Sequence, residues 1–205
     1  TFNTQYVDKA GAAYTRFAEG SPHFDAVGRQ QVSEPTTLGE YIHQYDALEN
    51  EYHDVTAGGG VISYESDSTN VLLTCGTASG DRASRTSHKY HIQQGGISQL
   101  IELSASISDA GKTGVTRWYG YGEDYVDGND GVYFLMEDTT IYVVVKSSTS
   151  GVVVNTKYPQ SEWNGDRVDG VGGAHNLSGV AMNPSKNNTL WIDLQGLTSG
   201  RVRFG

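Results

Sequence analysis

Four carboxylates are concentrated in a glycine-rich segment, residues 122–131, which contains Glu123, Asp124, Asp127 and Asp130. Calcium needs several oxygen ligands at fixed spacing, and an EF-hand loop places acids or amides at its first, third and fifth positions. Asp127 and Asn129 fit the first two of these positions, but Gly131 fails the third. The pattern favours a surface loop that leads into a strand, with incidental calcium binding as the alternative.

The same kind of acid could serve a glycan-degrading enzyme, for which Glu123, Asp127 and Glu137 are the candidates. Glycosidases need two carboxyl groups roughly 5–10 Å apart across a groove. A single loop cannot show such a groove, and the sequence contains no Gly-x-Ser-x-Gly nucleophile elbow. We therefore predict no catalytic residues and expect the chain not to be an enzyme.

The motifs that could bind phosphate or metal are incomplete. Gly111-Lys112-Thr113 ends like a P-loop, but Ser106 stands where that motif requires its first glycine. His88 and His91 are three residues apart on an expected strand and would point to opposite faces, and the other histidines are isolated along the sequence. A zinc site would need further ligands that the single cysteine cannot supply. We expect no metal and no cofactor.

Four aromatic residues are candidates for ligand or interface contacts: Trp118, Tyr119, Tyr121 and Trp163. Tryptophan faces can stack on sugars, and the 13 tyrosines against 5 phenylalanines suit partly wet faces and subunit interfaces. Trp163 begins a polar, turn-rich segment, where an anchor that pins a long loop to a sheet is the favoured role. A carbohydrate-binding module is the alternative.

Composition limits the partners. The 205 residues carry a net charge of −10, which repels phosphate backbones, so we expect no nucleic acid as a partner. Arg82, Arg85 and Lys89 are the nearest approach to a basic cluster and are predicted to line a solvated strand edge. No segment approaches 18 apolar residues, so no membrane insertion is expected. Because Cys75 is the single cysteine of this sequence, no intrachain disulfide can form. Cys75 is predicted to be a buried small hydrophobe.

Short apolar, β-branched and aromatic runs between glycine, asparagine, aspartate and serine are typical of a β-sandwich or barrel. Residues 132–137, 141–146 and 152–158 are joined by connections short enough for hairpins, so they predict an antiparallel meander. In residues 99–107 one face is consistently apolar, which predicts a strand with a core on one side only. The predicted strands are residues 61–64, 70–75, 89–93, 98–108, 132–137, 141–146, 152–158, 190–194 and 201–204.

Two parts of the chain depart from this pattern. Residues 37–51 carry Leu38, Tyr41, Ile42, Tyr45 and Leu48 at helical spacing behind a capping box, yet their tyrosine-rich surroundings would also suit a pair of strands. Both alternatives stay open. Residues 1–36 have little periodicity and are predicted to be an irregular, loop-rich N-terminal arm, which leaves residues 37–205 as the sandwich-like domain.

Two stretches also resemble a known family. One is residues 81–100, which contain Lys89-Tyr90-His91-Ile92-Gln93-Gln94-Gly95-Gly96; the other begins at Arg117-Trp118-Tyr119-Gly120-Tyr121 and continues through Tyr142-Val143-Val144-Val145-Lys146, Trp163-Asn164-Gly165-Asp166-Arg167 and Trp191-Ile192-Asp193 to Gly200-Arg201-Val202-Arg203-Phe204-Gly205. In this order the motifs are similar to a family of virion structural proteins of tailed phages and other large DNA viruses. The resemblance implies a virion part and offers no catalytic residues.

The sequence thus predicts an all-β, antiparallel sandwich-like fold, for which a jelly-roll arrangement is one form. The expected function is that of a structural virion protein in a tail fibre, head fibre, capsid decoration (a minor capsid protein) or baseplate-associated part. Its expected partners are copies of itself, with a trimer among the expected assemblies, and other virion proteins. A host-surface glycan is a further expected partner under the carbohydrate-binding or receptor-binding alternative, and a glycan-degrading enzyme is the second alternative.

Overall fold

The structure is a computed structural model, and it describes residues 4–7, 13–16, 36–92, 95–107, 109–196 and 200–205. The chain divides into two compact units, Thr1–Ile42 and His43–Gly205. In the first unit, β1 (Thr4–Val7) pairs antiparallel with β2 (Ala13–Arg16). Most of the predicted N-terminal arm lies outside the described residues.

Residues 37–51 form neither the helix nor the strand pair that their sequence allowed. In the second unit, the Asp46 carboxylate accepts a hydrogen bond from the Leu48 amide (2.8 Å), and Leu48 has a left-handed backbone with a φ of 53°. The carbonyl of His43 accepts a hydrogen bond from the Tyr64 hydroxyl (3.1 Å), and that of Ala47 accepts one from the Arg85 guanidinium. Local turns and distant side chains therefore replace the helical hydrogen bonds.

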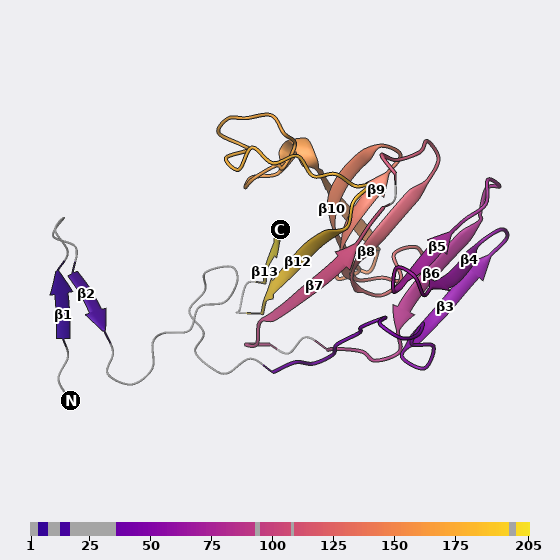
Figure 1. Cartoon of the computed structure of the whole chain (residues 1–205), viewed down its shortest axis with the longest axis horizontal. Helices are drawn as coiled ribbons and strands as arrows, with labels where there is room; N and C mark the ends of the chain where they lie inside the picture. Colours follow the sequence, from indigo (N-terminus) through magenta and orange to yellow (C-terminus); the bar gives the residue numbers. More distant parts are fainter. Residues whose placement is uncertain (1–3, 8–12, 17–35, 93–94, 108, 197–199) are drawn as a thin grey trace. The chain divides into compact units, whose positions relative to one another are not determined.

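A four-stranded antiparallel sheet forms one layer of the second unit (Figure 1). Its strands follow the order β11-β10-β9-β8, with β8 at Thr116–Gly122, β9 at Gly131–Glu137, β10 at Thr140–Ser147 and β11 at Val154–Pro159. Val143 on β10 lies opposite both Phe134 on β9 and Tyr158 on β11. The predicted meander is confirmed, and β8 is added to it. The short 3-10 helix η1 (Gln160–Glu162) follows β11.

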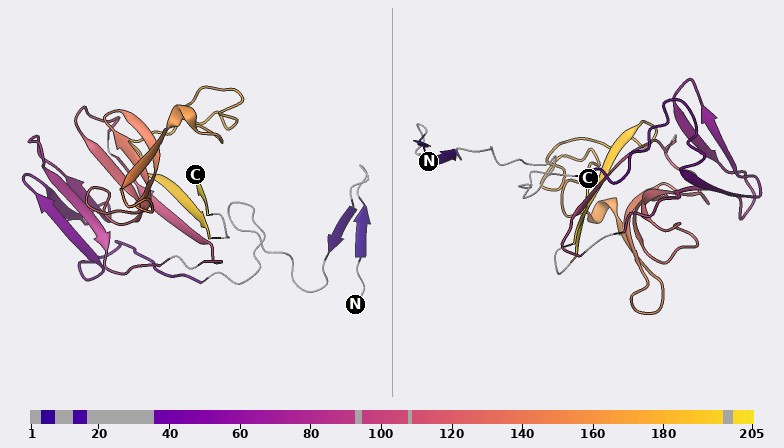
Figure 2. Two further views of the ribbon diagram at one scale, coloured as in Figure 1. Left: turned by 180° about the vertical axis from the view of Figure 1, so that it is seen from behind. Right: turned by 90° about the horizontal axis from the view of Figure 1, so that it is seen from below.

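A three-stranded antiparallel sheet forms the second layer, in the order β13-β12-β7 (Figures 1 and 2). Its strands are β7 (Gln99–Ala105), β12 (Asn188–Gln195) and β13 (Arg201–Phe204). Along β7, Ile101, Leu103 and Ala105 are half-buried, whereas Leu100, Glu102 and Ser104 are exposed. This alternation confirms that the strand covers a core on one face only.

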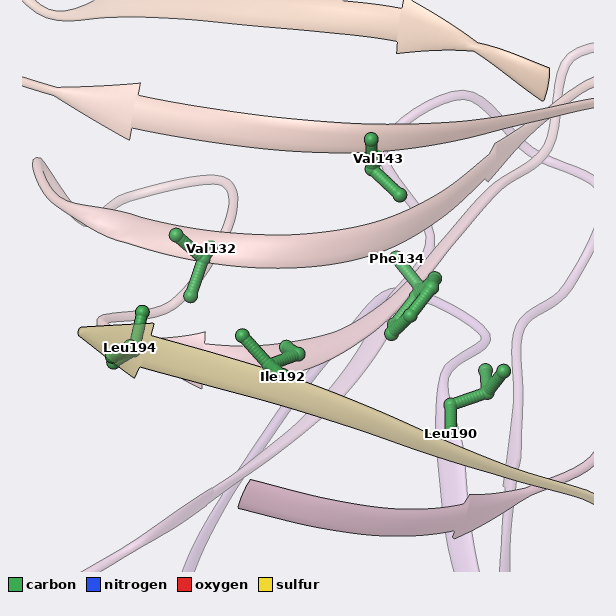
Figure 3. Close-up of a cluster of buried hydrophobic side chains, with 6 residues drawn as sticks. All are labelled: Val132, Phe134, Val143, Leu190, Ile192 and Leu194. Atoms are coloured by element: carbon green, nitrogen blue, oxygen red, sulfur yellow. The ribbon is translucent and has the colours of Figure 1, made fainter. Parts of the chain in front are cut away.

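The core lies between these two sheets. Val132, Phe134 and Val143 of the four-stranded sheet meet the side chains of β12, as Figure 3 shows; the β12 members are Leu190, Ile192 and Leu194. Ile192 has no exposed surface. Burying an aliphatic or aromatic side chain of this size contributes about 1.5–3 kcal/mol, so this cluster is the main stabilising feature of the fold.

Two further strand pairs complete the second unit. β3 (Tyr52–Ala57) pairs with β6 (Arg82–Ser87), and β4 (Val61–Glu65) pairs with β5 (Asn70–Thr74). All pairings are antiparallel, and the described part of the chain contains no α-helix. The expected all-β, antiparallel, sandwich-like fold is therefore confirmed.

In the second unit one predicted strand is wrong and three were missed; in the first unit β1 and β2 were also missed, since the arm was predicted to be irregular. Residues 89–92 form no strand, because the Ser87 hydroxyl donates to the Lys89 carbonyl (3.1 Å) directly after β6 and the apolar Tyr90 and Ile92 side chains are left exposed. Gln93, the last residue of that prediction, lies outside the described residues. The missed strands of this unit are β3, β6 and β8.

Candidate functional site

Strand β8 places its three aromatic candidates on opposite faces of the four-stranded sheet. Tyr119 stacks on Phe134 with ring centroids 5.9 Å apart, and burial raises the pKa of Tyr119 to about 12. The Tyr121 hydroxyl donates to Gln99 Oε1 on β7 (3.0 Å). Both tyrosines pack against the core between the sheets. They are therefore structural residues of the sandwich, because both are partly buried against its core.

Trp118 lies on the other face of the sheet. Its ring is 5.5 Å from that of Tyr125, beside the buried side chains of Tyr133 and Leu135. The Lys146 ammonium group, itself buried, donates to the Tyr125 carbonyl (2.7 Å). The acidic segment that contains Tyr125 thus covers Trp118 on this face.

Trp163 anchors the chain after β11. Its indole Nε1 donates to the Tyr158 carbonyl (3.1 Å), and its ring packs against the core clusters. The predicted role as a loop anchor is confirmed. The four aromatic candidates therefore form no common strip, since Trp118 is separated from the other three by the sheet, and the geometry does not favour a flat platform for a sugar.

The acidic segment is held by an arginine from a distant strand. Arg82 on β6 contacts Asp124 Oδ1 through Nη2 (2.5 Å) and Asp127 Oδ2 through Nη1 (2.5 Å). Burial on its own raises the pKa of Asp124, but hydrogen bonds from the Val126 amide and from Arg82 outweigh it, and the pKa lies below its ordinary value. This carboxylate therefore stabilises the loop in its ionised form.

The other acids that could have served catalysis also have structural partners. Glu123 Oε2 accepts a hydrogen bond from the Asn129 amide (2.5 Å), and Glu137 Oε2 lies 2.8 Å from Lys157 Nζ. Glu123, Asp127 and Glu137 thus have three different partners. Within the described ranges, no group of three or more histidine, cysteine, aspartate or glutamate side chains is placed to hold a metal ion.

Three side chains differ from their predicted environments. Arg82 and Arg85 do not line a solvated edge: their side chains are 18% and 6% exposed. Arg85 Nε lies 3.2 Å from Asp54 Oδ1, in an ion pair without hydrogen-bond geometry. Acidic partners explain their burial: Asp54 on the paired strand β3 for Arg85, and Asp124 and Asp127 in the loop between β8 and β9 for Arg82. Cys75 is exposed and not a buried hydrophobe, because it follows β5, a strand whose own Leu72 and Leu73 side chains are exposed.

The structure also brings together two histidines that are far apart in the sequence. His53 on β3 and His88, just after β6, have ring centroids 5.9 Å apart. The His88 amide donates to the Glu51 carbonyl (2.8 Å), which extends the β3–β6 pair. This contact could have been predicted only from the pairing of β3 with β6. The polar sequence of β6 gave no sign of a strand, so the pairing was not predicted.

Sheet edges and exposed apolar side chains are the most distinctive surface of the second unit. The two sandwich sheets end in β11, β8, β13 and β7, each of which is paired with another strand on one side only in the described part of the chain. Around β11, four apolar side chains are 41–69% exposed: Val152, Val153, Val154 and Tyr158. The signal for them was present in the predicted strand 152–158, whose alternate positions are apolar.

Comparisons with protein-family models, with curated proteins and with solved structures found no match for this chain. Among the described residues, no helix has the length and apolar character needed to cross a membrane.

Proposed function

We propose that this chain is a non-enzymatic structural component of a tailed-bacteriophage virion that acts by symmetric self-assembly and by contacts with other virion proteins. It would belong to a tail fibre, head fibre, capsid decoration or baseplate-associated part. In this role the β-sandwich is a rigid building block, and its surface carries the function.

The observation that carries the proposal is the open β11 margin of the sandwich. A bare strand edge with apolar neighbours is an aggregation hazard in a lone protein, and natural proteins usually cover or charge it. An assembly removes the hazard because another subunit covers the surface. The ordered motifs that resemble virion structural proteins support the same role, and the acids proposed for catalysis are occupied by structural contacts.

The virion assignment is tested with an antibody raised against the recombinant chain. Gold-labelled antibody on purified particles of the source phage should mark one defined part of the particle, and peptide mass spectrometry of the same particles should detect the chain. Particles of an unrelated tailed phage are the control. Absence of the chain from intact and from urea-opened particles would refute the assignment.

A receptor-binding role is a second candidate, favoured by the loop of residues 166–182. Asn176, 2% exposed, donates to Asp169 Oδ1 (3.1 Å) and to the Val180 carbonyl (3.0 Å) from inside this loop. Val168 has a φ of 43°, a strained value for a β-branched residue. The fixed loop leaves Leu177 86% exposed. Loss of adsorption to host cells in Leu177→Asp particles would support this role, and unchanged adsorption would count against it.

A further inference from the structure

Strand β11 has an open edge and an open face at the same place. As the outermost strand of its sheet, it directs the N–H and C=O groups of every second residue away from β10. In the described part of the chain no strand takes up these groups. The right-hand view of Figure 2 shows the β10–β11 hairpin extending from the sheet, with its outer side free of other strands.

The open face of β11 is the face that carries the core elsewhere in the sheet. The register places Tyr158 opposite Val143 and Val154 opposite Ser147, so Tyr158 and Val143 share one face. Val143 is only 9% exposed, whereas Tyr158 is 46% and Val154 50% exposed. The three-stranded sheet therefore stops short of β11, and the apolar side of this strand is only about half covered.

The other sandwich edges are protected, as edges in natural proteins usually are. β13 has only four residues and carries Arg201 and Arg203. β7 has the exposed Glu102 at its centre. β8 lies beside β7, to which Tyr121 is hydrogen-bonded through Gln99. These three edges are thus short, charged or flanked.

Strand β11 has little protection of this kind. Its one charged residue, Lys157, turns its ammonium group over the sheet to Glu137 Oε2 (2.8 Å) and to the ring of Tyr142, 5.8 Å away. Pro159 limits pairing only at the last position of the strand. The charge of Lys157 is therefore neutralised on the face of the sheet and does not guard the edge.

Charge also decides which surface two copies of this chain can share. Each copy carries a net charge of −10, so most pairs of surfaces repel. Residues 147–161, which include β11 and the turn before it, contain no aspartate or glutamate. Ser148 in this turn binds the Asp130 carboxylate through its amide and its hydroxyl, both at 2.8 Å, and the nearby Glu137 is paired with Lys157. Two copies can therefore bring their 147–161 segments together without repulsion between carboxylates of these segments.

We propose that β11 pairs antiparallel with β11 of a second copy across a two-fold axis, so that two four-stranded sheets become one continuous sheet. The contact satisfies the open backbone groups, and it covers Val154 and Tyr158. This inference rests on the proposed self-assembly and names its surface. An isologous contact closes on itself, so it gives a dimer or an assembly built from dimers, and it does not give a trimer.

The test compares two lysine substitutions at equally exposed strand valines. Val154→Lys places a charged side chain in the proposed contact, whereas Val61→Lys alters a valine of β4 that is 55% exposed and outside the proposed contact. Sedimentation equilibrium should give twice 22.1 kDa, or an even multiple, for the full-length wild type and for Val61→Lys. The dimer dissociation constant of Val154→Lys should be at least about tenfold higher, equivalent to about 1.4 kcal/mol.

Hydrogen exchange gives a second measurement that does not depend on how the variant folds. In wild-type protein, amides of residues 154–158 should exchange more slowly as the concentration rises through the dimer range, and amides of β4 should not change. A wild type that stays monomeric refutes both self-assembly and this contact. A wild type that assembles as a trimer, or without protection of β11 and without an effect of Val154→Lys, refutes the β11 contact alone.

Discussion

Arg82 Nη2 lies 2.5 Å from Asp124 Oδ1, and this contact joins the β3–β6 strand pair to the loop between β8 and β9. Both side chains are 18% exposed, and Arg82 reaches Asp127 as well. The contact links segments that are far apart in the sequence and share no strand pairing. It thereby fixes the loop whose Tyr125 packs on Trp118 at the outer face of the four-stranded sheet.

Arg82→Ala should lower the free energy of unfolding by about 1–3 kcal/mol, because it leaves two carboxylates without their charged donor. Lys112→Ala is the matched control: Lys112 is 70% exposed and lies 3.6 Å from Asp109, so its loss should cost no more than about 0.5 kcal/mol. Urea denaturation followed by tryptophan fluorescence measures both. Equal effects of the two substitutions would contradict the structural role of Arg82.

Two carboxylates of the loop between β8 and β9, Asp124 held by Arg82 and Asp130 held by Ser148, make stability depend on pH in acid. The folded-state pKa values of Asp124 and Asp130 lie below the ordinary value of 3.8, so these carboxyls stabilise the fold fully above that value. This contribution is lost as the pH falls from 3.8 through the folded-state pKa values. Burial lowers the pKa of His43 below its ordinary value of 6.5, so the free energy of unfolding should already decrease as the pH falls below about 6.5. The two carboxyls should add a further decrease below about pH 4.

Asp124→Asn separates this pH effect from general acid unfolding. The variant should be less stable than the wild type at pH 7, and the gap between them should narrow below about pH 4, where Asp124 of the wild type takes up a proton. Urea denaturation at a series of pH values gives the gap. A gap that stays constant into acid would show that the Asp124 charge does not contribute.

The core between the sheets should respond strongly to a cavity. Ile192→Ala removes part of a side chain with no exposed surface and should cost about 2–5 kcal/mol. Leu177→Ala, at a position that is 86% exposed, should change the free energy of unfolding by no more than about 0.5 kcal/mol. Thermal and urea denaturation of the two variants should rank them in this order. A mild effect of Ile192→Ala would mean that the sandwich core lies elsewhere.

The turn between β4 and β5 holds Thr69 at a φ of 50°, which is unfavourable for a β-branched residue. Thr69→Gly should raise the free energy of unfolding by about 0.5–1 kcal/mol, because relief of this strain exceeds the entropy that glycine adds to the unfolded chain. Thr149→Gly, in the turn between β10 and β11 where the threonine is not in a left-handed conformation, should lower it. Chemical denaturation of both variants decides the sign.

The strands that the sequence predicted correctly are rich in apolar, β-branched and aromatic residues. β9 and β10 are dense in apolar residues, and residues 99–105 show which face is covered. Strand β8 was not predicted because Gly120 interrupts its pattern. The strand requires glycine at this position, since a Cβ at Gly120 would lie 2.2 Å from the Val132 carbonyl oxygen. Strand β6 was not predicted because its sequence, RASRTS, has no apolar face. Only its pairing with β3 makes it a strand.

The candidate residues were predicted by type but not by environment. Trp118 and Tyr119 are adjacent, so on a strand they must face opposite ways, and this could be known only once β8 was known to be a strand. The partners of Asp124 and Asp127 could not be predicted, because Arg82 is distant in sequence. The open face of β11 depends on where the opposite sheet ends, which no local pattern encodes.

The central claim is that this sandwich works as one copy among several, and its mass in solution tests this most directly. Sedimentation equilibrium of the purified full-length chain at neutral pH and moderate salt should give twice the chain mass of 22.1 kDa, or a larger even multiple. A mass of 22.1 kDa at every concentration, up to the highest that stays soluble, would contradict the account.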